Sequence, residues 1–406
     1  MSLFRSLFRS RAVRGLLPGI VLLGLMVALP LASQAQSEMD GMVVRVENPR
    51  ATAQPEEVVS VPWDEVASVL GQGAQARVRD RATGEEITSQ VLDANADGRP
   101  DELLFLAGFR AGEARHFVVE AAAPADSVEA HVFAYHQQKR DDIAWENRQV
   151  AFRTYGMGLQ EIEEDFSSSG IDVWMKRVPE LVITDWYADG HYHTDTGEGA
   201  DFFSVGEALG AGGTALWRNG QLHRAPNFSD YEIVANGPLR AIIELEYGPW
   251  DAGGLSVTEH KRITIDAGTH FFRSESTFEA EGVDSLTHAT GLVKREGGVG
   301  SMSRAQPWAW LSLWGPVARG SGGHGDLGTA VLVDSARLQR MTETSDHYLA
   351  LSRVAAGEPA VHYVGTGWTA SEGVEDVEDW WRRLDGYAQL LQEPLRVEVV
   401  QGGASR

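Results

Sequence analysis

The chain of 406 residues carries 58 acidic and 35 basic side chains, a formal net charge of −23, and it contains no cysteine. Without cysteine it has no disulfide framework, thiol nucleophile or cysteinyl metal cluster. The acid excess argues against a non-specific nucleic-acid binder, because a phosphate backbone would be repelled. The hydrophobic fraction of 43% is ordinary for a globular protein with a sizeable core.

The first 35 residues have the pattern of an export signal. Four arginines precede an apolar run over residues 16–31, and residues 32–35 supply small side chains suited to cleavage. A retained membrane anchor is the alternative, but the run contains two prolines and is shorter than the roughly 20 residues that a spanning helix needs. We predict a signal peptide over residues 1–35 and a secreted or periplasmic protein whose mature chain has no membrane span.

Most of the remaining chain is predicted to form strands. Apolar residues recur at every second position between Gly, Asn, Asp and Pro breaks, as in residues 241–247, where Ala241, Ile243 and Leu245 share one face. Many such segments predict a mostly β protein built from antiparallel sheets. One late helix is expected over residues 372–391, because a capping-box pattern precedes it and four apolar residues share one face: Val374, Val377, Trp381 and Leu384.

The domain division is marked by one short stretch. Residues 121–126 resemble a linker, which would separate a small N-terminal β unit over residues 36–120 from a large β body over residues 127–406. A body of that length is within the usual range for a single all-β domain. The alternative is a surface loop within one continuous sandwich.

An acidic loop gives the most specific local pattern. Residues 93–102 place oxygen-bearing side chains at loop positions one, three, five and nine, with Gly98 at position six to permit the sharp bend. Leu104 stands where an EF-hand has its bidentate glutamate, so the loop is not an EF-hand. We predict a structural calcium ion and no cofactor for chemistry, with an acidic β-turn without metal as the alternative. The predicted ligands are Asp93, Asn95, Asp97 and Asp101.

Residues 185–202 combine histidine, aromatic residues and carboxylates between glycines. In an extended chain His191 and His193 point the same way, so both rings could address one ligand. They could bind a transition metal together with a carboxylate, or provide a general base with an orienting neighbour. The alternative is a polar loop whose histidines bond backbone carbonyls. Trp186 and Tyr192 are the candidate substrate-binding aromatics of this segment.

A third segment, residues 145–156, places Arg153 and Tyr155 on one strand face. An arginine can neutralise a substrate carboxylate, and a neighbouring phenol can take part in proton transfer. An ordinary salt bridge with a packed aromatic would give the same pattern. Trp145 belongs to a set of tryptophans near turns that could stack on a sugar ring, although core filling explains many of them.

Several of these segments come in the order seen in one secreted family. That family is labelled as a domain of unknown function and is common in bacterial polysaccharide-degradation loci. The chain also resembles the oligosaccharide dehydratase of ulvan degradation, over nearly all of its mature length. The segments that carry the resemblance are residues 93–105, 145–147, 152–156, 172–174, 192–193, 197–202, 206–213 and 237–240.

The resemblance implies a large β-sandwich of galactose-mutarotase type that removes water from a terminal uronic acid of an oligosaccharide, giving a 4,5-unsaturated uronate. That reaction needs a base, an acid and a counter-charge for the carboxylate. Our hypothesis is that His193 or His191 is the base and that Tyr155 is the acid or its partner. Arg153, with Asn147, would grip the carboxylate, and Lys294 and Arg295 are second-rank candidates for binding an anionic sugar.

Two other functions stay open. A glycoside hydrolase would need two carboxylates roughly 5 to 10 Å apart, one of them Asp201 or Glu198. A non-catalytic oligosaccharide-binding protein would use the tryptophans as a platform and would bind without forming a product. In each case the expected partner is an oligosaccharide, anionic in the leading hypothesis, and not a nucleic acid.

Overall fold

A computed structural model describes residues 41–71, 75–123, 128–161, 167–190, 192–317 and 323–400. Within these ranges the protein is mostly β, and its named strands pair antiparallel, as the alternation of apolar residues predicted. The predicted signal peptide, residues 1–35, lies outside the described residues. No helix in the described ranges is long and apolar enough to cross a membrane.

The N-terminal residues form two sheets and a short helix around their own core. That core includes Val44, Phe105 and Phe117, all fully buried. One sheet has the strand order β26-β1-β7-β3-β4 and the other β2-β6-β5. Their bounds are β1 Met42–Glu47, β2 Gln54–Pro62, α1 Trp63–Leu70, β3 Gln75–Asp80, β4 Glu86–Ile87, β5 Ser89–Leu92, β6 Glu102–Phe109, β7 Ala114–Ala122 and β26 Arg396–Val400.

The last strand of the chain completes this N-terminal part. β26 pairs with β1, with Val43 opposite Val400. A contiguous unit over residues 36–120 therefore leaves out one of its strands. The pairing joins strands from the two ends of the described chain, and no local sequence pattern reveals such a partner.

The large body contains an eight-stranded sheet, with the strand order β15-β16-β17-β18-β25-β22-β21-β20. Its central strands bury apolar residues on one face, such as Ile263 and Val331. The strand bounds are β15 Asp230–Asn236, β16 Arg240–Asp251, β17 Ser256–Asp266, β18 Phe271–Ala280, β20 Val299–Ser303, β21 Trp308–Pro316, β22 Asp326–Asp334 and β25 Pro359–Trp368.

A five-stranded sheet packs on this eight-stranded sheet to form a β-sandwich. Phe278 and His288 meet between the two layers, with ring centroids 5.9 Å apart. Gly212 adopts φ +91°, and a Cβ there would lie 2.4 Å from Val364, so only glycine fits this close approach. The order is β14-β13-β19-β24-β23, with bounds β13 Ala211–Arg218, β14 Gln221–His223, β19 Ser285–Val293, β23 Leu338–Glu343 and β24 His347–Ala355.

A third sheet of the body supplies the strands of the candidate site. Trp145 and Phe152 project from it onto Phe272 of β18, with ring centroids 5.2 and 4.8 Å away. This contact anchors one face of the sheet in the core, and the other face carries the polar side chains of the candidate site together with a smaller apolar cluster around Trp174. The order is β12-β11-β10-β9-β8, with bounds β8 Val132–Gln137, β9 Asp142–Asn147, β10 Ala151–Tyr155, β11 Asp172–Lys176 and β12 Gly199–Ala200, beside η1 Met157–Glu161 and α2 Ile183–Asp189.

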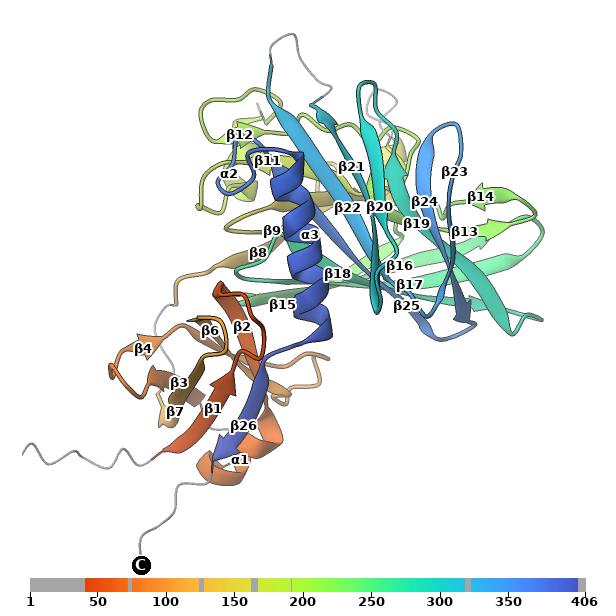
Figure 1. Ribbon diagram of the computed structural model, residues 1–406. Helices are drawn as coiled ribbons and strands as arrows, with labels where there is room; N and C mark the ends of the chain where they lie inside the picture. The colour runs from red at the N-terminus through yellow and green to blue at the C-terminus, as the bar shows by residue number, and fades with distance from the viewer. Residues whose placement is uncertain are drawn as a thin grey trace, which may run out of the picture. The chain divides into compact units, whose positions relative to one another are not determined.

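The late helix, α3, spans Val377–Gln392 and packs against the eight-stranded sheet (Figure 1). It begins later than predicted, because Gly373 has φ +82° and the cap is Asp376, whose side chain accepts from the Asp379 amide. Trp380 and Leu384 are its buried residues, in place of the predicted Val377 and Trp381. The Trp380 indole donates to the Ser312 hydroxyl of β21 at 2.8 Å, which fixes the helix on the sheet.

Candidate active site

Cross-strand register brings four polar residues to one face of the third sheet. Tyr155 stands opposite Asp142, and Arg153 stands opposite Asp172. Directly opposed residues of antiparallel strands share a face, so the alternation that pairs Arg153 with Tyr155 also adds the two aspartates. The neighbouring Phe152 points the other way, into the core.

Arg153 lies at the centre of this cluster. Its Nη2 is 2.6 Å from Asp172 Oδ2 and 2.9 Å from Asp201 Oδ2, and its Nη1 is 3.6 Å from Asp142 Oδ2. Burial opposes its charge, but Tyr155, Asp172 and Asp201 together raise the pKa of Arg153 well above its usual range. The guanidinium is therefore permanently charged and surrounded by three carboxylates.

This arrangement changes the role expected of Arg153. Its side chain is only 6% exposed. A guanidinium that already meets three carboxylates has little positive charge left for a substrate carboxylate. In this structure Arg153 organises the acids of the site, in contrast to the predicted grip on the substrate.

Tyr155 is buried beside Arg153 and donates its hydroxyl to Asp172 Oδ2 at 2.8 Å. Arg153 Nη2 in turn donates to the Tyr155 oxygen at 3.2 Å. Burial raises the pKa of Tyr155 well above its usual range, with Arg153 opposing the shift. The phenol therefore keeps its proton and serves the cluster as a fixed hydrogen-bond donor.

The Asp142 carboxyl group has a raised pKa. The residue is 1% exposed, and burial raises its pKa to about 7, although Arg153 and the Tyr187 hydroxyl favour the ionised form. Tyr187 donates to its Oδ2 at 3.3 Å, whereas Oδ1 has no hydrogen-bond partner among the described residues. At neutral pH this carboxyl group is poised between its acid and its conjugate base.

His193 is the exposed member of the group. Its side chain is 49% exposed, and its Nδ1 lies 3.0 Å from the backbone oxygen of Asp201 and 3.3 Å from that residue's carboxylate. Because the backbone oxygen is only an acceptor, Nδ1 carries the hydrogen and the lone pair of the neutral ring lies on Nε2. Asp201 thus orients the imidazole ring, and His193 would be the base of the pair. His191 lies outside the described residues.

These groups line one cavity of about 140 Å³. Arg140 also lines it, at the turn that precedes β9, and its charge favours the ionised form of the Asp142 carboxyl. The lining of the cavity therefore includes a histidine, a carboxyl group with a raised pKa and a cation. Its other charged and polar lining residues are Arg153, Tyr155, Ser167, Tyr192, Asp201 and Ser204.

An aromatic cluster forms the back of the cavity. Tyr192 stacks on Trp174 at 5.3 Å with an interplanar angle of 15°, and Trp186 stacks on the same indole at 5.5 Å. Trp186 donates its indole N–H to Glu198 at 3.0 Å. Tyr192 therefore lines the cavity, where a substrate-binding residue would lie. Trp186 packs on Trp174 and does not line the cavity.

The structure places two predicted substrate-binding residues in the core. Trp145 is fully buried between Phe152 and Phe272. Asn147 is also fully buried, and its amide bonds backbone groups alone: it donates to the Asp266 and Thr269 carbonyls and accepts from two amide N–H groups. Their hydrogen bonds and packing serve the fold, which corrects the expectation of substrate contact.

Lys294 lies elsewhere as well. Its Nζ is 2.8 Å from Glu343 and 2.7 Å from the Thr344 carbonyl oxygen, so it ties the residue after β19 to the turn between β23 and β24. Arg295 is closer to the cavity, because it donates to the backbone oxygen of Ser204, one of the lining residues. Lys294 therefore lies at a turn, paired with Glu343, and does not line the cavity.

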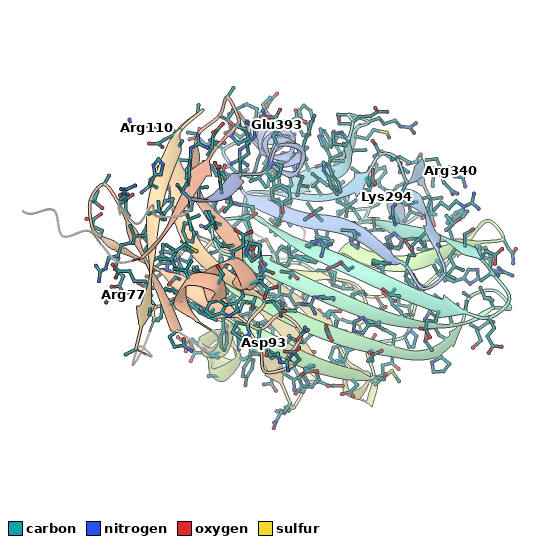
Figure 2. The ribbon with its side chains drawn as sticks, turned by 90° about the horizontal axis from the view of Figure 1, so that it is seen from below. Arg77, Asp93, Arg110, Lys294, Arg340 and Glu393 are labelled. Carbon is teal, nitrogen blue, oxygen red and sulfur yellow. The ribbon has the colours of Figure 1, made fainter. Side chains whose placement is uncertain are left out.

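The acidic loop lies at the surface, well apart from Lys294 in the view of Figure 2. Its side-chain oxygens accept backbone N–H groups: Asp93 from Gly98 at 2.7 Å, Asn95 from Asp97 at 3.0 Å, and Asp101 from Ala94 at 2.7 Å. Across the described residues no group of three or more His, Cys, Asp or Glu side chains is arranged to hold a metal ion. The calcium ion remains a prediction for this loop.

Sequence reasoning missed Asp142, Tyr187 and Arg140. Asp142 is placed by its register against Tyr155, and no local pattern reveals which strands will pair. Arg140 belongs to a turn whose sequence is unremarkable for a charged loop. Asp172 was visible as part of the motif over residues 172–174, but its contact with Arg153 needs the pairing of β10 with β11.

The fold and the cavity define a mostly β protein with a candidate active site on one sheet. The chain belongs to the family described as Domain of unknown function (DUF4861), whose model matches residues 46–397. It is 29% identical over 401 residues to a protein named "Uncharacterized protein P7" from Formosa agariphila, a match that covers 94% of this chain and 99% of that relative.

Among solved structures, a glycosyl hydrolase family 38 protein from Enterococcus faecalis matches with a TM-score of 0.48 and 10% identity, over 89% of this chain and 48% of the other. The galactosidase domain of alpha-galactosidase-sucrose kinase matches with a TM-score of 0.29 and 9% identity, over 58% of this chain and 42% of the other. The chain thus spans about half the length of the solved structures it matches.

Proposed function

We propose that the protein eliminates water from the terminal uronic acid of a short oligosaccharide and so forms a 4,5-unsaturated uronate. The observation that carries this proposal is the joint presence of His193, Asp142 and Arg140 around one cavity. An elimination next to a carboxylate needs a base, an acid and a counter-charge. The three side chains supply one of each.

In the proposed reaction His193 Nε2 takes the proton from C5 of the sugar. The electron pair of the C5–H bond becomes the C4–C5 double bond, and the C4–O bond breaks. The Asp142 carboxyl gives its proton to the departing hydroxyl, which leaves as water. The enzyme then holds a protonated His193 and an ionised Asp142, and solvent returns both groups to their starting states.

Arg140 neutralises the substrate carboxylate, whose charge grows as the proton leaves C5. Asp142 is a better proton donor than Tyr155, because its pKa of about 7 is close to working pH, whereas the pKa of Tyr155 is raised well above its usual range. Tyr155 is then the partner that holds Asp172 and Arg153 in place.

The test uses the purified mature chain and a panel of uronate oligosaccharides, followed by ultraviolet absorbance and mass spectrometry. Rising absorbance of a conjugated alkene with the loss of one water supports the dehydratase. Rising absorbance with chain scission would instead mean a lyase that expels an alcohol. Binding without any product would favour the oligosaccharide-binding alternative.

One observation favours a glycoside hydrolase as the second candidate. The carboxyl group of Asp142 is poised to hold a proton, whereas Asp201 lines the same cavity and is paired with Arg153. A protonated and an ionised carboxyl group in one site are the pair that hydrolysis uses. Scission of the oligosaccharide without the alkene absorbance would assign this function.

Export and calcium binding belong to the same proposal. An exported enzyme would meet acidic oligosaccharides outside the cytoplasm, and calcium in the loop over residues 93–101 would brace the N-terminal part. Cleavage of the chain after residue 35 in secreted material, read by N-terminal sequencing, tests the first. A fall in melting temperature on chelation, reversed by calcium, tests the second.

A further inference from the structure

Two further cavities lie alongside α3. They measure about 360 and 310 Å³ and share Thr269, Phe271 and Tyr387 in their linings, so they form one continuous depression that we call the α3 groove. None of its lining residues lines the candidate active site. The groove is therefore a separate feature of the described part of the molecule.

Arg383 gives the groove a positive charge that forms no ion pair within the described residues, although Asp379 favours this charge from nearby. Its Nη2 donates to the Gly373 carbonyl oxygen at 2.8 Å and its Nη1 contacts His270 Nδ1 at 2.9 Å, both neutral partners. Its Nε is buried without a hydrogen-bond partner, and no carboxylate of the described residues forms an ion pair with it. By contrast, the neighbouring Arg382 is paired with Asp379.

His270 remains neutral beside this cation. Burial and the charge of Arg383 lower its pKa to about 3. Its Nδ1 accepts from the guanidinium, so the ring carries its hydrogen on Nε2. Burial also lowers the pKa of Arg383, with Asp379 opposing the shift. A desolvated cation whose hydrogen bonds go to neutral acceptors is an arrangement that an anion would stabilise.

The same groove offers aromatic surface. The Tyr387 ring stacks on Phe271 at 3.9 Å with an interplanar angle of 10°, and Tyr363 meets it edge-on at 5.6 Å. All three rings line the larger cavity. A rigid, partly exposed aromatic surface next to a cation suits a ligand that has an apolar ring face and a negative group.

We propose that the α3 groove binds a saccharide that bears a carboxylate or sulfate group, with the oxyanion held by Arg383 and the sugar ring packed against Tyr387. The site is distinct from the candidate active site and does not depend on the reaction proposed there. It would retain an acidic oligosaccharide on the enzyme without taking part in the chemistry.

Gly386 provides a matched pair of variants. It lines the groove from α3, and a Cβ at this position meets no atom within 4 Å, so larger side chains enter the groove without displacing the core. Gly386→Glu introduces a negative charge that competes with the ligand, whereas Gly386→Gln introduces the same bulk without charge. Arg383→Gln removes the cation, and Arg353→Gln, at an exposed position on β24, is the control.

The experiment is calorimetric titration of the mature chain in an Arg140→Gln background, which removes the cation proposed to bind the substrate carboxylate in the candidate active site. The probes are glucuronate, glucose 6-sulfate, inorganic sulfate and glucose. We expect both acidic sugars to bind and glucose not to bind. Arg383→Gln and Gly386→Glu should weaken binding about tenfold or more, with Gly386→Gln and Arg353→Gln close to the parent.

The outcomes separate the possible ligands. Binding of only one acidic sugar would identify carboxylate or sulfate as the group recognised. Equal binding by the Gly386→Glu and Gly386→Gln variants would overturn the proposal, and so would binding of inorganic sulfate without either sugar. Turnover of a short substrate by Gly386→Glu, without the Arg140 change, should match the wild type, so failure of the groove is distinguishable from failure of the active site.

Discussion

Two of the clusters of buried charged side chains in the body of the protein differ in balance and in access to solvent. Around Arg153, three carboxylates share one cation, the cluster lines a cavity, and His193 extends to the surface. Around Lys261, one cation faces one carboxylate, Glu259, at 3.3 Å, and the two side chains are 2% and 1% exposed. Tyr247 and Thr214 complete the second cluster with hydrogen bonds.

The difference favours the Arg153 cluster as the candidate for catalysis. In a balanced ion pair inside a sandwich each charge is neutralised by its partner. The protonation of such a pair changes little with pH, because burial and the partner charge shift each pKa in opposite directions. In the Arg153 cluster, burial raises the pKa of Asp142 to about 7, and the negative charge of Asp172 adds to this shift. Stored protons and an exposed histidine beside a cavity are the features expected of a catalytic site.

The largest expected effect is on turnover. His193→Gln should lower kcat by about 100-fold to 10,000-fold, because it removes the proposed base, and should leave the melting temperature near that of the wild type, since the side chain is half exposed. Product formation followed by ultraviolet absorbance and a thermal melt measure the two quantities. Unchanged kcat on the true substrate would remove His193 from the role of base.

In the Lys261 cluster a substitution should also have a large effect, but on stability and not on turnover. Lys261→Met leaves Glu259 buried without its partner and should lower the free energy of unfolding by about 3–5 kcal/mol. The double variant Lys261→Met/Glu259→Gln should recover much of this loss, because the unpaired charge is gone. Urea titration gives the unfolding free energies, and the folded fraction should retain its kcat. A kcat that falls with Lys261→Met would mean that the two clusters are coupled.

Asp142→Asn should lower turnover and raise stability in one pH range. The folded protein holds the Asp142 proton to about pH 7, whereas the ordinary value is 3.8, so ionisation destabilises the folded state as pH rises between these values. The variant should therefore match the wild type at pH 4 and unfold at higher urea concentration at pH 8.

The same variant tests the proposed acid. Wild-type kcat should fall as pH rises through about 7, because the proton donor ionises, and this fall should be absent from the residual activity of Asp142→Asn. If the fall persists in the variant, another group donates the proton. If stability at pH 8 does not increase, the carboxyl group is ionised without cost in the folded protein.

The sequence predicted the strands and one face of the site but not the pairing that builds it. Alternation over residues 149–155 placed Arg153 and Tyr155 together, and the structure confirms their contact at 3.2 Å. Asp142 and Asp172 join them through the registers of β9 and β11, which depend on turn geometry and core packing far along the chain. Nothing local to residue 142 reveals that partner.

Burial explains the predictions that were wrong. Trp145 and Asn147 have side chains suited to sugar contact, yet the alternation of β9 turns Trp145 into the core, and Asn147 ties β9 to the backbone of residues 266–269. The predicted start of α3 was wrong because the sequence contains two possible caps, the pattern at residues 369–372 and Asp376. Gly373 adopts the left-handed region between them, so the helix begins after Asp376. The first outcome depends on tertiary contacts that composition and spacing do not reveal, whereas the second depends on which of two local capping patterns the backbone adopts.

The smallest expected effects come from a matched pair of tyrosines, one in each cluster. Each hydroxyl bonds a charged partner: Tyr247 contacts Lys261 Nζ at 3.1 Å, and Tyr155 donates to Asp172 at 2.8 Å. Tyr247→Phe and Tyr155→Phe should each lower the free energy of unfolding by about 1.5–3 kcal/mol, because a hydrogen bond to a charged group is lost. Urea titration and kcat measurements on both variants separate structure from function: kcat should fall only with Tyr155→Phe, since that hydroxyl positions Arg153 and Asp172 beside the cavity. An equal fall in both variants would mean that the Lys261 cluster also supports turnover, and the distinction between a balanced, buried cluster and an unbalanced, accessible one would no longer predict which of them is catalytic.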